Sequence, residues 1–319
     1  MATAVVQSHQ IRVERPRRRF ARGLLVVSAV TLALLLGAYS AMSVYLATRL
    51  TAERHLPIGT PADVGLTYES IAFDSEVDHI PLKGWYIPSG GTSAIILVHG
   101  LDGNRWDTND WLAQLVPVFV DNGFDVFTFD QRGHGESGGE HVGLGTLERR
   151  DVAAAVRVVE QHGVPPGHIA LFGQSFGAAT ALNSAASLPD VAAVVSDSAY
   201  ADATERLNFE IHRVTGLPPL FGRGMGVAAS VLYGIDPSVT PERSMAQLAP
   251  RPVLLIHGTG DTRIPVENAY RLKAATDSPN VELWIVTGAE HTRSYAAEPA
   301  LYTQKVVSFF EQSLAAQTP

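Results

Sequence analysis

The sequence alternates short apolar runs with stretches of helical length, and this alternation limits the fold more than any other feature. Eight runs are rich in β-branched or aromatic residues, at 66–73, 82–87, 94–98, 126–129, 169–172, 191–195, 253–256 and 281–286. Helical stretches separate most of them, at 106–122, 147–162, 176–187, 266–276 and 300–315. Short apolar runs of this kind are typical of strands buried on both faces. The pattern therefore predicts an α/β fold with a mostly parallel, doubly wound sheet of about eight strands, opened by an antiparallel pair.

An uncharged apolar segment precedes this alternation. Residues 24–47 contain no charged side chain, and as a helix they would span about 36 Å, which is enough for a bilayer core. Six arginines lie between positions 12 and 22, whereas only Arg49 and Arg54 closely follow the segment. The positive-inside tendency then places residues 1–22 in the cytoplasm as a basic N-terminus. Residues 23–48 are predicted to be a transmembrane signal anchor of a single-pass protein whose large domain is extracytoplasmic.

Two other interpretations of the N-terminus stay open. Ala38-Tyr39-Ser40 is an acceptable small-x-small cleavage site, so the segment would also serve as a removed signal peptide. The basic run would alternatively bind phosphate or nucleic acid. The apolar run is longer than the usual signal-peptide core of about 7 to 15 residues, which favours a retained anchor.

Composition excludes several classes of protein. The net charge is −8, and residues 1–22 carry +5, which leaves −13 for the remainder and argues against nucleic-acid binding. The absence of cysteine excludes disulfides, thiolate nucleophiles and cysteine metal sites. After a short polar link at 51–60, neither a repeat nor a low-complexity tract interrupts the chain. One domain is therefore predicted over residues 60–316.

A serine in a strand-to-helix turn is the first candidate for chemistry. The predicted strand 169–172 is followed by Gly173-Gln174-Ser175-Phe176-Gly177, which matches the G-x-S-x-G elbow. The two glycines permit a tight turn in which strand and helix backbones nearly touch, and the turn lifts the serine hydroxyl clear of the sheet. The pattern alone is weak evidence, but a strand before it and a helix after it supply the required context.

A serine nucleophile needs a histidine to take its proton and an acid to fix the tautomer of that histidine. Asp261 follows the strand 253–256, and His291 follows the strand 281–286. His291 is the only histidine after Asp261, so the order Ser, Asp, His makes it the predicted base. Asp197 and Asp130, which also follow strands, remain competing acids.

The negative oxygen of an acyl-transfer transition state needs preorganised donors. The N–H of Phe176, directly after the candidate nucleophile, and the N–H of Leu101, in the loop after strand 94–98, are predicted to form this oxyanion hole. A simpler interpretation treats His99-Gly100 only as the end of a strand.

These residues together resemble the α/β-hydrolase superfamily, in particular the serine aminopeptidase S33-like and Bem46-like hydrolases, over about residues 60–316. The resemblance rests on Leu97-Val98-His99-Gly100, Phe129-Asp130-Gln131-Arg132-Gly133-His134-Gly135-Glu136-Ser137, the Ser175 elbow, Leu254-Leu255-Ile256-His257-Gly258 leading to Asp261, and His291. It implies an α/β-hydrolase fold, a structural rather than catalytic loop at 130–137, a short helical cap at about 198–248, and hydrolysis of an ester, thioester, amide or lipid without a cofactor.

The predicted function is that of a serine hydrolase that cleaves a carboxylic ester or thioester through an acyl-enzyme. The expected substrate is a small-molecule or lipid-like acyl compound, because a tether holds the site near amphiphiles of the bilayer. An acyl pocket is expected beneath the cap, lined by Tyr200, Phe209, Leu217, Leu220, Phe221, Met225 and Tyr233, although an ordinary packed helix pair explains the same residues.

Two alternative functions remain. A serine aminopeptidase would share the triad but needs acidic cap residues such as Glu205 or Glu210 to hold a substrate amine, and a non-catalytic hydrolase-fold module would bind without chemistry. No cofactor or metal is expected: H-E-x-x-H is absent, and Gly222-Arg223-Gly224-Met225-Gly226 does not follow a predicted strand, as a phosphate-binding turn should. The sequence does not determine the oligomeric state.

Overall fold

A computed structural model describes residues 16–48, 56–106, 112–218 and 220–315 and contains one eight-stranded sheet. Its strands match the eight predicted runs and are β1 (Glu69–Asp74), β2 (Pro81–Ile87), β3 (Ser93–Val98), β4 (Phe124–Asp130), β5 (Ile169–Gln174), β6 (Val191–Asp197), β7 (Val253–Gly258) and β8 (Val281–Val286). Their spatial order is β1-β2-β4-β3-β5-β6-β7-β8. From β3 the chain first adds β4 on one side and then β5 to β8 on the other, as expected for a doubly wound sheet.

Strand direction follows the prediction as well. β2 is antiparallel to β1 and β4, and the other neighbouring pairs are parallel. β4, β5, β6 and β7 are buried along their whole length, which explains why their sequences are continuous apolar runs instead of alternating ones. The prediction of a mostly parallel sheet covered on both faces is confirmed.

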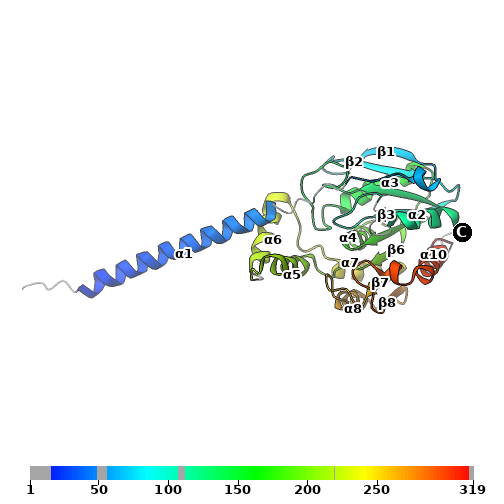
Figure 1. The fold of residues 1–319 in the computed structure, drawn as a ribbon. Coiled ribbons are helices and arrows are strands. Elements are labelled where there is room, and N and C mark those ends of the chain that lie inside the picture. Colours follow the sequence, from blue (N-terminus) through cyan, green and yellow to red (C-terminus); the bar gives the residue numbers. More distant parts are fainter. Residues whose placement is uncertain (1–15, 49–55, 107–111, 219, 316–319) are drawn as a thin grey trace, which may run out of the picture.

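Helices cover both faces of the sheet and so complete the core (Figure 1). One face packs against α2 (Leu112–Asp121) and α10 (Pro299–Ala315). The other packs against α3 (Arg149–Gln161), α4 (Phe176–Ala185) and α8 (Glu267–Ala274). The short helices η1 (Pro61–Val64) and α9 (Ser294–Ala297) lie in connections. Residues 107–111 of the predicted helix 106–122 lie outside the described residues.

The N-terminal apolar segment forms the long helix α1 (Pro16–Thr48), which projects away from the domain (Figure 1). Its stretch Ala21–Thr48 is long and apolar enough to cross a membrane, and its leucine and valine side chains from Leu24 to Leu36 are largely exposed. Residues 1–15 of the predicted cytoplasmic N-terminus and residues 49–55 of the predicted link lie outside the described residues.

Three helices occupy the segment predicted to be a cap. They are α5 (Ala203–Thr215), α6 (Leu220–Tyr233) and α7 (Pro241–Leu248). α7 packs against α4 and α8, and therefore belongs to the body of the domain. α5 and α6 pack against each other, and α6 also packs against α1, so these two helices form the end of the domain from which α1 emerges (Figure 1).

Candidate active site

Ser175 lies in the tight turn between β5 and α4. Its backbone has φ 54° and ψ −117°, a left-handed conformation that side chains rarely adopt, so the turn is strained. Steric contacts explain why glycine occupies the positions on either side of this turn. A Cβ at Gly177 would clash with the carbonyls of Val98 and His99, and one at Gly173 would clash with the Gly177 backbone. The close approach of β3, β5 and α4 thus requires glycine on both sides of the serine.

The three predicted side chains meet in one hydrogen-bonded chain. Ser175 Oγ lies 2.8 Å from His291 Nε2, and His291 Nδ1 lies 2.6 Å from Asp261 Oδ2. Because a carboxylate only accepts hydrogen bonds, Nδ1 carries the proton and Nε2 is left free to accept from the serine hydroxyl. This is the tautomer that a general base acting on serine needs.

The loop after β7 holds the Asp261 carboxylate in place. Its Oδ1 accepts hydrogen bonds from the amides of Arg263 and Ile264, at 2.9 and 2.7 Å. Burial raises the pKa of Asp261, but hydrogen bonds to His257 and His291 outweigh this effect and hold the pKa below its usual value. The carboxyl is therefore ionised and able to stabilise a protonated imidazole.

Asp197, the main competing acid, is used elsewhere. It is completely buried and accepts hydrogen bonds from Ser198 Oγ and Tyr302 OH, each at 2.8 Å. Burial raises its pKa. His291 Nδ1 thus donates its hydrogen bond to Asp261, and Asp197 has a packing role.

The two predicted oxyanion donors border the same space. Phe176 is the first residue of α4, and Leu101 follows β3. A Cβ on Gly100 would lie 3.7 Å from Ser175 Cβ, so this loop passes directly beside the serine. His134 Nε2 lies 2.6 Å from the Leu101 carbonyl and ties the loop to the segment after β4.

His99 shows that the end of β3 is more than a strand terminator. Its Nε2 accepts a hydrogen bond from the Gln131 amide at 3.1 Å, and its Nδ1 donates to the Gly100 carbonyl at 2.7 Å. Burial lowers the pKa of His99 to about 3, so the ring is neutral. The histidine acts as a fixed bridge between the two loops.

Two cavities meet at Ser175. The larger, of about 400 Å³, is mainly polar and is lined by residues that include Asp102, Thr262, Arg263, Glu290 and Arg293. The smaller, of about 100 Å³, is mainly apolar and is lined by residues that include Leu101, Leu144, Phe176, Tyr200, Leu207 and Ile264. An apolar space therefore lies on one side of the serine and a polar space on the other.

Few of the side chains expected to line an acyl pocket reach the cavity beside Ser175, and the alternative of a packed helix pair fits α5 and α6 better. Tyr200 lines the smaller cavity, but Phe209 and Leu220 are exposed and Met225 is buried against α1 and α5. Residues that were not anticipated take their place, notably Leu144, Leu207 and Ile264. Leu144 stands between two glycines in a loop, and no periodicity in the sequence identifies it.

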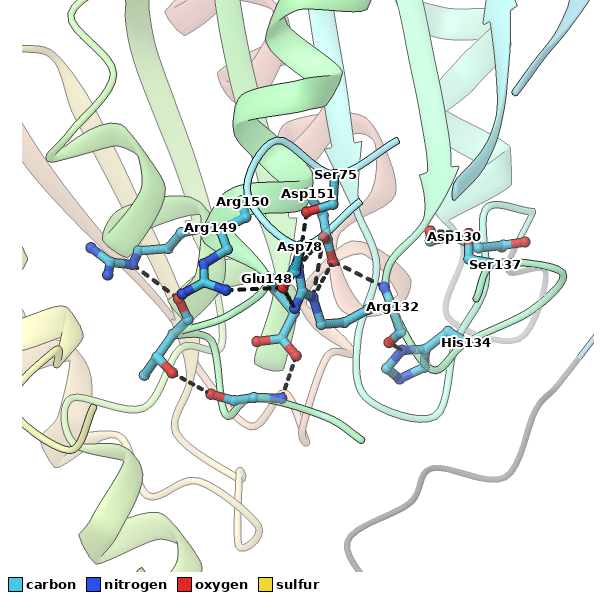
Figure 2. Close-up of polar contacts among 12 residues, drawn as sticks. Ser75, Asp78, Asp130, Arg132, His134, Ser137, Glu148, Arg149, Arg150 and Asp151 are labelled. Atoms are coloured by element: carbon cyan, nitrogen blue, oxygen red, sulfur yellow. Dashed lines mark hydrogen bonds and ion pairs between the residues drawn. The ribbon is translucent and has the colours of Figure 1, made fainter. Parts of the chain in front are cut away.

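The segment after β4 is built into a buried ion-pair network around Arg132 (Figure 2). The Arg132 guanidinium pairs with Asp151 on α3 and with Asp78 in the β1–β2 turn, each at 2.6 Å. Its Nη2 also donates a hydrogen bond to the Ser75 hydroxyl at 2.9 Å. These contacts hold together three segments that are distant in the sequence. Arg132 therefore has a structural role.

Asp130 and Ser137 close the same loop. The Arg105 guanidinium pairs with the Asp130 carboxylate, and Ser137 Oγ donates to the Asp130 carbonyl at 2.6 Å. A Cβ at Gly135, whose φ is 45°, would clash with the Asp130 carboxylate. Asp130 is therefore also occupied in packing, which removes the third candidate acid.

Glu148 fixes the loop that carries Leu144. Its buried carboxylate accepts hydrogen bonds from the amides of Gly143 and Gly145, the latter at 2.9 Å. The Leu144 carbonyl accepts from Tyr200 OH at 3.2 Å, and Leu144 itself has a positive φ of 55°. The position of Leu144 in the wall of the apolar cavity thus depends on the buried carboxyl of Glu148.

This carboxyl is expected to make stability depend on pH. Burial, with a contribution from the charge of Asp151, raises the pKa of Glu148 from 4.5 to about 7. The folded state therefore favours the neutral acid, and stability is lost as pH rises from about 4.5 to about 7, by on the order of 3 kcal/mol. We expect the thermal midpoint of the wild type in detergent to fall relative to that of Glu148→Gln over this range. A constant gap between the two midpoints would contradict the assignment.

Among the described residues, no group of three or more His, Asp or Glu side chains is arranged to hold a metal ion.

Comparison with known proteins places the geometry in context. Residues 93–225 match the model of a family described as the alpha/beta hydrolase fold. The protein YfhR of Escherichia coli is 30% identical over 259 residues, which cover 77% of this chain and 81% of the relative. YqkD of Bacillus subtilis is 28% identical over 238 residues, which cover 72% and 75%.

A solved structure is also similar. The esterase Pf2001 of Pyrococcus furiosus superposes with a TM-score of 0.70 at 25% identity, covering 83% of this chain and 98% of that one. The similarity extends over nearly the whole of that esterase.

Proposed function

Because this chain belongs to the α/β-hydrolase family, we propose that it is a serine hydrolase that cleaves a carboxylic ester or thioester through an acyl-enzyme. The observation that carries the proposal is the contact of Ser175 Oγ with His291 Nε2, with Asp261 on the far nitrogen of the ring. The esterase activity named for the similar Pyrococcus furiosus structure agrees with it.

The proposed reaction begins with attack of Ser175 Oγ on an acyl carbonyl while His291 Nε2 takes the hydroxyl proton. The amides of Leu101 and Phe176 bind the oxygen that becomes negative, and the dipole of α4 adds to the second donor. The protonated His291, stabilised by Asp261, then gives its proton to the leaving group. Water activated by the same ring releases the acid and restores the serine.

The cavities narrow the choice of substrate. The apolar cavity of about 100 Å³ has the volume of about three water molecules and holds a short acyl chain. The polar cavity of about 400 Å³ accommodates a larger leaving group. The proposed substrate is therefore a small-molecule or lipid-like ester with a short acyl chain in the apolar cavity and a larger polar alcohol opposite.

Leu207 is expected to limit acyl length. It lies on α5 and lines both the apolar cavity and a smaller one between α5 and α6, so shortening it joins the two. We expect Leu207→Ala to move the optimum of an aryl-ester series towards longer acyl chains, with kcat/KM for a medium-chain ester rising by about tenfold over that for acetate. Leu301→Ala, an exposed leucine on α10, is the matched control. An unchanged chain-length profile in Leu207→Ala would show that acyl groups bind elsewhere.

The ion pairs of Glu205 and Glu210 support the aminopeptidase alternative less than the esterase. Glu205 pairs with Arg271. Glu210 lines the apolar cavity, but hydrogen bonds from Arg213 and Arg206 lower its pKa to about 2 and satisfy its charge. Neither carboxylate is thus available for a substrate amine. Comparing aryl esters with aminoacyl arylamides tests this directly, and a preference for the arylamides would reverse the order of the two candidates.

We further propose that α1 is a retained anchor, with the N-terminus in the cytoplasm and the domain extracytoplasmic. Tyr39 OH donates a hydrogen bond to the Leu220 carbonyl at 2.8 Å, and its ring lies 5.3 Å from that of Phe221. Cleavage after Ser40 would remove these contacts, which supports retention. The protein should therefore stay in the membrane pellet after carbonate extraction at its full length, and a soluble product that begins near residue 41 would rule out the anchor.

A further inference from the structure

The helix α6 presents a stripe of apolar side chains to the outside of the domain. The α6 stripe consists of Leu220, Val227 and Val231, which are between 58% and 79% exposed. Met225 and Ala229 lie on the opposite face and are buried against α1 and α5. Contiguous exposed apolar side chains are uncommon on the surface of a soluble domain, and they mark contacts with proteins or lipid.

The helix α1 packs immediately beside this stripe. Gly224 follows Leu220 by four residues and precedes Val227 by three, which puts it on the edge of the same face. A Cβ at Gly224 would clash with Tyr39 and Ser43 of α1, so the two helices touch at this point. The apolar surface of α1 and the α6 stripe are therefore continuous.

The position of this contact along α1 determines how deep α6 would lie in the membrane. A bilayer core of about 30 Å is crossed by about 20 helical residues, and counting from Leu24 reaches Ser43. Ser43 is the residue that meets Gly224. If α1 spans the membrane, α6 consequently lies at the level where the acyl chains end and the lipid headgroups begin.

The composition of α6 suits this level. Arg223 is exposed between Leu220 and Val227 on the sequence, and an arginine stem lies along apolar surface while its guanidinium reaches a phosphate. An apolar face with a basic residue is typical of helices that lie in the membrane interface. The neighbouring helix α5 supplies Ala203 and Leu207 to the apolar cavity beside Ser175.

We propose that the α6 stripe lies in the outer headgroup layer of the membrane, so that the helix pair α5–α6 rests on lipid beside the candidate active site. The proposal rests on the retained anchor proposed above. It identifies the occupant of the stripe as the bilayer, and it brings the cavity wall on α5 close to amphiphiles dissolved there.

The absence of cysteine from the chain makes a clean test possible. Single cysteines in the full-length protein, at Val231→Cys in the stripe, Leu34→Cys in α1 and Gln312→Cys in α10, are labelled with an environment-sensitive fluorophore. α10 lies at the end of the domain away from α1 (Figure 1). The protein is reconstituted in phosphatidylcholine vesicles that contain one of two spin-labelled lipids, with the nitroxide near the headgroup or deep in the acyl chain. Quenching by each lipid is compared with quenching by iodide in the water, and the deep nitroxide serves for Leu34, which lies near the middle of the 24–43 span.

The label at Val231 is expected to be quenched several-fold more strongly by the headgroup-proximal lipid than the label at Gln312, and to be protected from iodide. If the Leu34 label is quenched by lipid while Val231 and Gln312 respond equally to iodide, the anchor holds and the α6 proposal is overturned. If the Leu34 label is not quenched by the deep acyl-chain nitroxide, the anchor itself is wrong. Protection of Val231 from both quenchers would indicate a protein partner, such as a second copy, and would likewise overturn contact with lipid.

Discussion

Replacing Ser175 with alanine is expected to lower kcat/KM for any accepted ester by on the order of 10⁴-fold or more, because no other group supplies the nucleophile. Residual activity would come from the oxyanion donors and from substrate binding alone. The hydroxyl contacts His291 and carries no packing role, so the thermal midpoint should change little. Hydrolysis of aryl esters by purified protein in detergent gives the measurement.

The control is Ser187→Ala, an exposed serine after α4. It should retain full activity and full labelling by a fluorophosphonate probe, whereas Ser175→Ala should lose both. If Ser175→Ala kept its activity, the proposed acyl-enzyme mechanism would be refuted. A wild-type protein that folds but neither hydrolyses esters nor reacts with the probe would favour the non-catalytic module.

Asp261→Asn is expected to lower kcat by about 10³- to 10⁴-fold. An asparagine retains Oδ1 for the amides of Arg263 and Ile264, so the loop should keep its shape. Its amide nitrogen donates towards His291, however, and this forces the proton onto Nε2, where it opposes the serine hydroxyl. The loss should therefore appear in kcat with little change in stability.

Asp197→Asn separates the two acids. Asp197 bonds Ser198 and Tyr302 and does not hydrogen-bond His291, so we expect less than a tenfold change in kcat. The substitution should act mainly on the thermal midpoint, because it disturbs a fully buried group. If Asp197→Asn lost more activity than Asp261→Asn, the assignment of the acid would be reversed.

Much of this arrangement is predictable from the sequence for identifiable reasons. The strands are recognisable because parallel strands buried on both faces must be continuous apolar runs, and all eight runs form strands. Ser175, Asp261 and His291 follow β5, β7 and β8, whose carboxyl ends lie at one edge of the sheet. Their convergence therefore follows from topology, while their catalytic roles await the substitutions above.

The cavity walls were less accessible to such reasoning. Leu144 lines the site because Glu148 fixes its loop, and Leu207 does so because α5 packs against α6. Both depend on tertiary contacts that leave no periodic signal. The spacing of Met225 fits a pocket wall or a packed helix pair, and its burial against α1 and α5 supports the second.

The contact between α1 and α6 gives the anchor a second consequence. Ala47 of α1 and Leu207 of α5 belong to the same buried cluster, so the last turns of α1, the proposed anchor, are also part of the domain's interior. A shortened chain beginning after Thr48 would expose Met225 and leave an apolar surface beside the cavity. Removing α1 to obtain a soluble protein would thus remove part of the domain's core, and preparations should keep the helix and cover it with detergent.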